Sequence, residues 1–215
     1  MAFKATFLVS LLYLVFALCS SLQTADKNAA KVEITVYYET HCPDSKDFIK
    51  NQLYPTYEKI AEIMDIILVP FGKATYTETN GSVTFECQHG VKECRGNMLQ
   101  SCMKNIYKDI AKVLPVVYCM EKRISPEKAL KACTAQTTLN ATVISNCANS
   151  SEGERYLLEE GKRTKSLSPA LSFVPSITIN SVYSRTQQSE ALRDLRKVVC
   201  KEYKGPKPEG CNGSL

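Results

Sequence analysis

The spacing of apolar residues predicts a strand, a helix and a second strand at the start of the chain. Residues 32–38 form a largely apolar run typical of a strand, and residues 65–71 form a short continuous run that predicts a buried strand. Between them, apolar residues recur at helical spacing from Phe48 to Met64. Pro55 falls within that helix and is expected to bend or break it.

The middle of the chain predicts a hairpin and then a block of helices. Asn80-Gly81 lies between the segments 73–77 and 83–86, and both turn residues tolerate a positive φ, which favours a β-hairpin. Residues from about 93 to 165 have a mainly helical pattern and hold five cysteines. The first part of this block, about 93–113, is expected to be a single helix.

The end of the chain returns to a strand at 171–180 and closes with an amphipathic helix around Leu195. A strand, a helix and a strand, followed by a hairpin-like element and a terminal helix, is similar to the order of elements in the thioredoxin fold. We therefore predict an α/β, thioredoxin-like domain over 26–215, with a cysteine-rich helical insertion at about 93–165. In that fold a cis-proline lies beside the active-site thiol, and Pro175 is placed to be that residue. A trans-proline at a strand start is the alternative.

The turn after the first strand holds the candidate chemistry. Cys42 stands where a thiol–disulfide enzyme keeps its attacking thiol, and Ser45 stands where the second thiol of a Cys-x-x-Cys pair would be. A reductase needs that second thiol to release itself from the mixed disulfide with its substrate. Ser45 can donate a hydrogen bond to the Cys42 sulfur but cannot resolve a mixed disulfide. A structural role for Cys42 is the alternative.

Neighbouring charges act on the Cys42 thiol in both directions. The start of the following helix favours the thiolate, whereas Glu39, Asp44 and Asp47 would oppose it and raise its pKa. His41 could stabilise the thiolate, although a surface histidine at a turn is the simpler expectation.

The N-terminus predicts a secretory signal. Lys4 precedes a mostly apolar run from Phe7 to Cys19, too short to span a bilayer comfortably, with cleavage expected between residues 19 and 25. No later stretch approaches the length of a membrane span. The formal net charge is +5, with basic and acidic residues interleaved, so we do not expect a nucleic-acid-binding protein. The expected location is secreted or lysosomal.

The cysteine count fits one free thiol and four disulfides. Setting aside Cys42 and the signal-peptide Cys19 leaves eight cysteines, which we expect to pair in the oxidising secretory pathway. They are Cys87, Cys94, Cys102, Cys119, Cys133, Cys147, Cys200 and Cys211. Cys94 and Cys102 would lie about 12 Å apart on one helix, too far to bond each other. The rest of the connectivity is open.

Four Asn-x-Ser/Thr sequons also favour a secreted chain. Each lies among polar or turn-forming residues, where a glycan could be attached. They are Asn80, Asn140, Asn149 and Asn212.

A sixteen-residue segment, Cys87–Cys102, resembles the signature of the gamma-interferon-inducible lysosomal thiol reductases. It reads Cys-Gln-His-Gly, two residues, Glu-Cys, two residues, Asn, four residues, Cys. The resemblance implies a thioredoxin-like fold and reduction of protein disulfides at acidic pH in endosomes and lysosomes. Cys42 then matches the family's nucleophile, and Pro175 its cis-proline. The chain departs from the family at Ser45, and at Ser176, where the family tends to carry an aromatic residue.

A zinc site made of Cys87, His89, Cys94 and Cys102 is a weaker reading of the same segment, because paired Cys-x-x-Cys hooks are missing. We expect no metal and no cofactor.

Three functions are compatible with this sequence. The favoured one is a protein with weak or lost reductase turnover that binds protein partners or disulfide-bearing substrates. The second is a monothiol reductase in which an external thiol resolves the Cys42 mixed disulfide. The third is a covalent dimer linked through Cys42.

Overall fold

The computed structural model describes residues 29–213. Lys31–Tyr203, together with the residues from Lys207 onward, forms one compact unit, and the remaining described residues fall outside it. The expected signal peptide lies outside the described residues. Within the described part of the chain, no helix is both long and apolar enough to cross a membrane.

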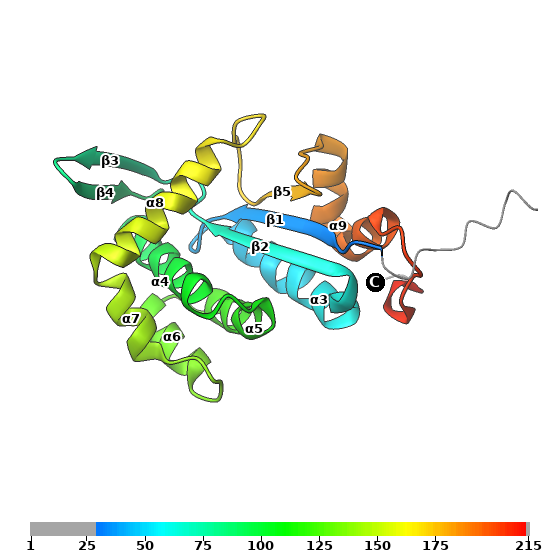
Figure 1. The fold of residues 1–215 in the computed structure, drawn as a ribbon, viewed down its shortest axis with the longest axis horizontal. Helices are drawn as coiled ribbons and strands as arrows, with labels where there is room; N and C mark the ends of the chain where they lie inside the picture. Colours follow the sequence, from blue (N-terminus) through cyan, green and yellow to red (C-terminus); the bar gives the residue numbers. More distant parts are fainter. Residues whose placement is uncertain (1–28, 214–215) are drawn as a thin grey trace, which may run out of the picture. The chain divides into compact units, whose positions relative to one another are not determined.

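A three-stranded sheet with the order β2-β1-β5 forms the centre of the unit (Figure 1). β1 (Val32–Tyr38) pairs in parallel with β2 (Met64–Pro70) and antiparallel with β5 (Ser176–Ile179). Helices pack against this sheet, and its apolar side chains are buried against them. The predicted α/β, thioredoxin-like fold is confirmed.

The expected strand at 171–180 is too long, because β5 begins only at Ser176. The Val174–Pro175 peptide bond is cis, and the proline has no N–H to give to a ladder. In addition, the Ser176 hydroxyl donates to the carbonyl of Phe173 at 2.8 Å, so that this carbonyl serves a local turn.

The helix that follows β1 is divided around Pro55, as its sequence predicts. It consists of α2 (Pro43–Phe48), a π-helical segment η1 (Ile49–Leu53) and α3 (Tyr54–Ile60), followed by a short 3-10 turn η2 (Ala61–Ile63). Pro55 lies in the first turn of α3. A wider π turn before it accommodates the carbonyl groups that a proline cannot pair with.

The hairpin forms where Asn80-Gly81 predicts it. β3 (Thr75–Thr79) pairs with β4 (Ser82–Glu86), and both turn residues have positive φ. Figure 1 shows this hairpin beside α8.

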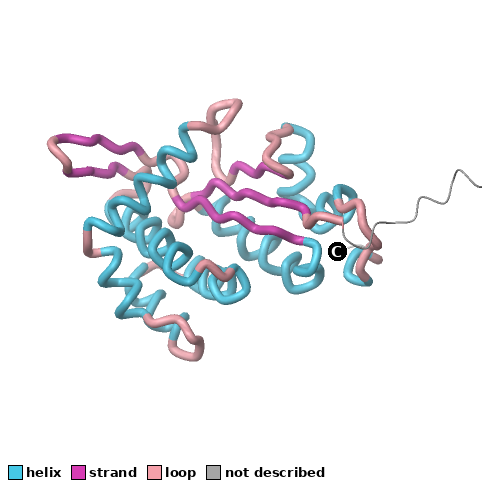
Figure 2. The backbone as a smooth tube through the Cα atoms, viewed as in Figure 1, coloured by secondary structure: helices cyan, strands magenta, loops and turns pink. Residues whose placement is uncertain are grey.

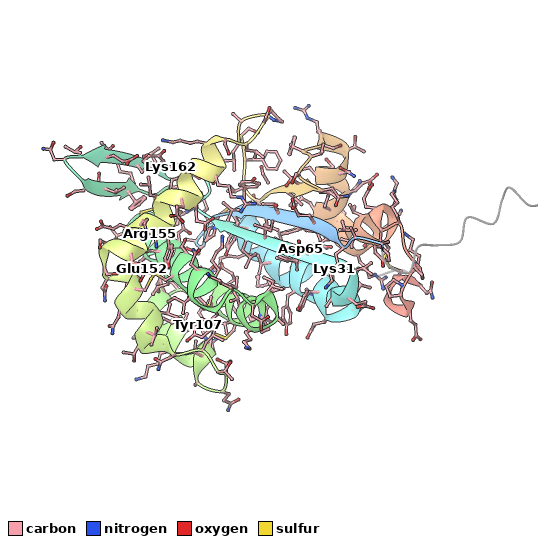
Figure 3. All side chains as sticks on the ribbon, in the orientation of Figure 1. Lys31, Asp65, Tyr107, Glu152, Arg155 and Lys162 are labelled. Carbon is pink, nitrogen blue, oxygen red and sulfur yellow. A yellow bond between two sulfur atoms is a disulfide. The ribbon has the colours of Figure 1, made fainter. Side chains whose placement is uncertain are left out.

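The inserted block contains five helices between Val91 and Lys165, drawn in cyan in Figure 2. They are α4 (Val91–Tyr107), α5 (Ile110–Glu121), α6 (Pro126–Thr134), α7 (Ala141–Ala148) and α8 (Ser151–Lys165). On the exposed surface of α8, Arg155 lies within ion-pair distance of Glu152 and Glu159 (Figure 3 labels Arg155 and Glu152). The chain ends with α9 (Arg185–Glu202) and a short turn η3 (Glu209–Cys211).

The prediction of a single helix over 93–113 is wrong. Lys108 takes a left-handed conformation (φ 50°) and ends α4, and the Asp109 side chain then caps α5 by accepting from the Ala111 N–H at 3.0 Å. An aspartate is a strong N-cap, so it favours a new helix start over continuation of the old one.

Candidate functional site

The Cys42 side chain lies at the start of the helix that follows β1. Cys42 is the N-cap of α2 and is only 8% exposed, and its carbonyl accepts from the Lys46 N–H at 3.0 Å. Among residues 29–213, it is the one cysteine outside a disulfide. The thiol therefore stands at a helix start, where the sequence places it.

Ser45, the residue expected in place of a second thiol, is fully buried one turn into the helix. The sequence allows a hydrogen bond from this hydroxyl to the Cys42 sulfur, but the structure records a different one. Instead, the hydroxyl accepts from the backbone N–H of Glu39 at 3.5 Å. Ser45 therefore connects the start of α2 to the end of β1, across the turn that carries Cys42.

The signature segment holds this turn through hydrogen bonds that sequence reasoning did not find. The Thr40 N–H donates to the side chain of Asn97 at 3.0 Å, and the Thr40 hydroxyl donates to the backbone carbonyl of Glu93 at 3.2 Å. Gly96 packs directly against Thr40: a Cβ at Gly96 would lie 2.3 Å from the Thr40 hydroxyl oxygen. Glu93 and Asn97 are four residues apart and thus share one helix face. This spacing is the feature of the sequence that could have indicated a shared contact.

Two buried carboxylates and an imidazole meet beside the turn. Glu39 and Glu93 are both fully buried, and Nδ1 of His89 contacts Oε2 of Glu93 and lies 3.5 Å from Oε1 of Glu39. Burial, the largest effect, raises the pKa of Glu39. Glu39 therefore does not act simply as a fixed negative charge near Cys42, as its sequence position suggests.

The donor atoms of Glu39, His89 and Glu93 lie within 4.8 Å of one another, so their spacing alone would fit a metal ion. The imidazole nitrogen that would bind an ion is, however, engaged with the Glu93 carboxylate. The same carboxylate oxygen also accepts from the His89 backbone N–H at 2.9 Å. We therefore assign this cluster to hydrogen bonding.

His41, expected as a surface histidine at a turn, is only partly at the surface. His41 is half-buried, and both of its ring nitrogens are buried without a hydrogen-bond partner. Burial, the largest effect, lowers the pKa of His41, so the ring binds a proton less readily than a free histidine does. Asp44 and Asp47, by contrast, are exposed.

Pro175 lies next to the end of β1 from which the Cys42 turn leaves. Tyr37 pairs with Ser176 in the antiparallel ladder, so Pro175, the residue before Ser176, lies opposite Tyr38. Gln188 from α9 holds this loop, because its side chain donates to the Pro175 carbonyl at 3.0 Å and accepts from the Ile177 N–H at 2.7 Å. Nothing in the sequence pattern singled out Gln188.

A second buried polar chain runs from β1 to α5. The Tyr38 hydroxyl donates to the side chain of Gln100, which donates to Glu121 at 2.6 Å. Burial raises the pKa of Glu121 to about 7. Sequence reasoning missed this carboxyl as well, because it lies on an otherwise apolar helix.

The eight remaining cysteines form four disulfides. The pairs are Cys87–Cys94, Cys102–Cys147, Cys119–Cys133 and Cys200–Cys211. Cys94 and Cys102 bond to different partners, as their spacing requires. Their sulfurs and that of Cys87 are therefore not available as thiolates for the zinc site considered above. All four sequon asparagines, Asn80, Asn140, Asn149 and Asn212, are exposed.

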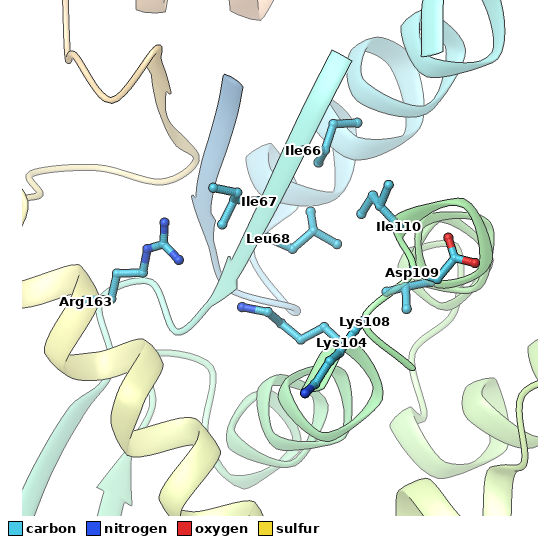
Figure 4. Close-up of a pocket in the computed structure, with 9 residues that line it drawn as sticks. Ile66, Ile67, Leu68, Lys104, Lys108, Asp109, Ile110 and Arg163 are labelled. Carbon is cyan, nitrogen blue, oxygen red and sulfur yellow. The ribbon is translucent and has the colours of Figure 1, made fainter. Parts of the chain in front are cut away.

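A cavity of about 230 Å³ lies elsewhere, along the outer side of β2 (Figure 4). It is lined by Ile66, Leu68 and residues of the α4–α5 connection, with Lys104 and Arg163 at its side. Lys104 is already paired with Glu160 at 2.6 Å. The cavity includes no residue of the Cys42 turn, so it is not part of the thiol site.

A thioredoxin-like fold with a lone thiol at this turn defines the class of protein: a relative of the thiol–disulfide oxidoreductases. Residues 33–137 match the family model described as gamma interferon inducible lysosomal thiol reductase. The chain is 36% identical to the "Gamma-interferon-inducible lysosomal thiol reductase" of Carassius auratus, over 94% of this chain and 80% of that protein. It is 33% identical to the protein of the same name from Mus musculus, over 84% of this chain and 72% of that protein.

Solved structures agree on the fold. Chlamydia trachomatis DsbA matches with a TM-score of 0.54 at 13% identity, covering 81% of this chain and 91% of that one. BdbD from Bacillus subtilis matches with a TM-score of 0.53 at 12% identity, covering 79% and 91%. The chain belongs to the gamma-interferon-inducible lysosomal thiol reductase family.

Proposed function

We propose that this family member has weak or lost disulfide-reductase turnover and acts by binding protein partners. The observation that carries the proposal is Ser45, which is fully buried at the position of the resolving thiol. A hydroxyl cannot attack a mixed disulfide, so a complex formed at Cys42 is released only by a thiol from outside. Partners with disulfides would therefore remain on the protein for long times.

We further propose that the protein is a secreted or lysosomal glycoprotein. The exposed sequons, the four disulfides and the family's lysosomal members support this location.

A monothiol reductase is the second candidate, favoured by the free Cys42 at a helix start. The Cys42 thiolate would attack a substrate disulfide, form a mixed disulfide and release one substrate thiol. A small-molecule thiol would then attack that mixed disulfide, and a second one would complete the exchange. In sum, one disulfide and two external thiols give two substrate thiols and one external disulfide.

One experiment separates the two candidates. Reduction of a fluorescent protein-disulfide substrate would be measured with excess small thiol, at about pH 4.5 and about pH 7, because thiol exchange depends on the thiolate fraction. The variants are wild type, Cys42→Ser and Ser45→Cys. Inactive wild type with activity gained in Ser45→Cys supports the binding role. Wild-type turnover that disappears in Cys42→Ser overturns it in favour of the monothiol reductase.

The covalent-dimer alternative has its own readout. Non-reducing electrophoresis would show a dimer band in wild type that is missing in Cys42→Ser.

A further inference from the structure

The Glu39–His89–Glu93 cluster joins the signature segment to the Cys42 turn. Glu39 directly follows β1, whereas His89 lies two residues before α4 and Glu93 lies in its first turn. Both carboxyl groups are fully buried, and each has one oxygen, Oε1, without a hydrogen-bond partner. The His89 side chain is 37% exposed, so protons can reach the cluster from solvent through it.

Two carboxylates this close cannot both be charged at low cost. Besides His89 and Glu93, the group facing Glu39 is Lys73, whose N–H donates to its Oε2 at 2.8 Å. Lys73 and His89 favour the charged carboxylate, whereas burial and the Glu93 charge oppose it, with burial the largest effect. Glu39 therefore binds a proton at a higher pH than a free glutamate does.

A movement of the Glu39 side chain would be transmitted to the Cys42 turn, because Glu39 is packed against Gly72 and its backbone is bonded to Ser45. A Cβ at Gly72 would lie 2.4 Å from Oε2 of Glu39, which leaves the carboxylate no space in that direction. The backbone N–H of Glu39 donates to Ser45, and the next residue, Thr40, is bonded to the carbonyl of Glu93. These two hydrogen bonds of the turn thus each involve a backbone group of one of the two carboxylate residues.

We propose that Glu39 is a positioning residue for Cys42, and that a proton taken up by the Glu39–His89–Glu93 cluster holds the turn in its reactive conformation. At acidic pH the proton removes the repulsion between the carboxylates, and the turn is fixed. At neutral pH the repulsion loosens it. The proposal rests on the proposed function only in taking Cys42 as the thiol that meets partner disulfides; it requires no turnover.

The test measures Cys42 directly. The rate of reaction with the small, uncharged N-methylmaleimide, divided by the thiolate fraction from ultraviolet absorbance, would be followed between about pH 4 and pH 8. Cys42→Ser provides the blank, because the other described cysteines are in disulfides. The variants are the near-isosteric Glu39→Gln and Glu93→Gln. Glu160→Gln is the matched control, a buried carboxyl paired with Lys104 on α4 and outside the cluster.

In wild type, the rate per thiolate should fall at least about fivefold as pH rises, the lower end of an ordinary coupling between two sites. Glu39→Gln and Glu93→Gln should abolish this fall, while Glu160→Gln retains it. A profile in Glu39→Gln identical to wild type would overturn the proposal, as would an equal loss in Glu160→Gln. Absence of reductase turnover would not affect it, because alkylation is measured independently.

Hydrogen exchange gives a second readout that separates positioning from general loss of stability. At about pH 7.5, amides of residues 39–48 should exchange faster than at about pH 5, after correction for the intrinsic rate, in wild type but not in Glu39→Gln. Faster exchange in Glu39→Gln throughout the chain would indicate a merely structural role and would sink the idea.

Discussion

The Cys42 turn and the helical insertion are stabilised by different kinds of interaction, although α4 takes part in both. At the turn, the contacts are hydrogen bonds to buried polar residues: Thr40 donates to the Asn97 side chain and to the Glu93 carbonyl. In the insertion, α4 is joined to α7 by the Cys102–Cys147 disulfide, and a further disulfide joins α5 to α6. The first half of α4 therefore contacts the Cys42 turn through hydrogen bonds, and its second half is joined to α7 by a disulfide.

The two kinds of interaction respond differently to pH. Hydrogen bonds of buried carboxyl groups depend on the protonation state, whereas a disulfide does not titrate. The disulfides of the insertion are thus independent of pH, although two of its buried carboxyl groups, Glu121 and Glu160, also have raised pKa values.

The largest expected effect comes from opening the disulfide that anchors the insertion. Replacing both Cys102 and Cys147 by Ala should lower the free energy of unfolding by about 4 kcal/mol, because the bond closes a long loop. The same change at Cys87 and Cys94, seven residues apart, should cost only about 2 kcal/mol. Denaturant unfolding at acidic pH measures both. An equal loss in the two variants would contradict the loop-length argument.

The next largest effect is the pH dependence of stability that arises from the buried carboxyl group of Glu121. Burial raises the pKa of Glu121 to about 7, so the folded chain binds this proton more tightly than the unfolded chain does. Stability should therefore be highest below about pH 4.5 for this group, and fall by up to about 3 kcal/mol as pH rises through about 7. Glu121→Gln should flatten that part of the curve, as measured by urea unfolding at several pH values. The exposed Glu62→Gln is the control, and an equally flattened curve there would contradict the assignment.

Much of the fold could be predicted from the sequence because it depends on local signals. The apolar run at 32–38 and the Asn80-Gly81 turn each indicated one element, and each lies where expected. The helical spacing after Cys42 also indicated helix, but the expected end at Met64 is too late, because Met64 begins β2. The break at Lys108 was missed because its cause is the competing cap at Asp109, which periodicity does not detect.

The candidate site was predictable only in part. Cys42 and Ser45 stand out because their spacing is a motif, but the residues that hold them do not. Asn97 is 57 residues from Thr40, and Gln188 is 13 residues from the Pro175 carbonyl that it binds. Such pairs come together only through tertiary packing and leave no periodic pattern in a single sequence.

The smallest of the three effects compares two helical glycines, one in each region. A Cβ at Gly96 would lie 2.3 Å from the Thr40 hydroxyl, and one at Gly161 would lie 2.7 Å from the ring of Phe71. Gly→Ala at either position should therefore cost about 1–3 kcal/mol through overpacking, less up to about 1 kcal/mol regained from helix propensity. Thermal unfolding at acidic pH measures both losses.

The two glycine variants should differ at the thiol. Only Gly96→Ala pushes on Thr40, the residue through which α4 holds the turn, so only this variant should change the alkylation rate per Cys42 thiolate. Adding Thr40→Ala removes the crowded hydroxyl and should recover part of the lost stability. It should not restore the wild-type rate, because the hydrogen bond from the Thr40 hydroxyl to the Glu93 carbonyl is then gone, although the Thr40 N–H still donates to Asn97. A change in alkylation with Gly161→Ala as large as with Gly96→Ala would show that the turn and the insertion are not held independently.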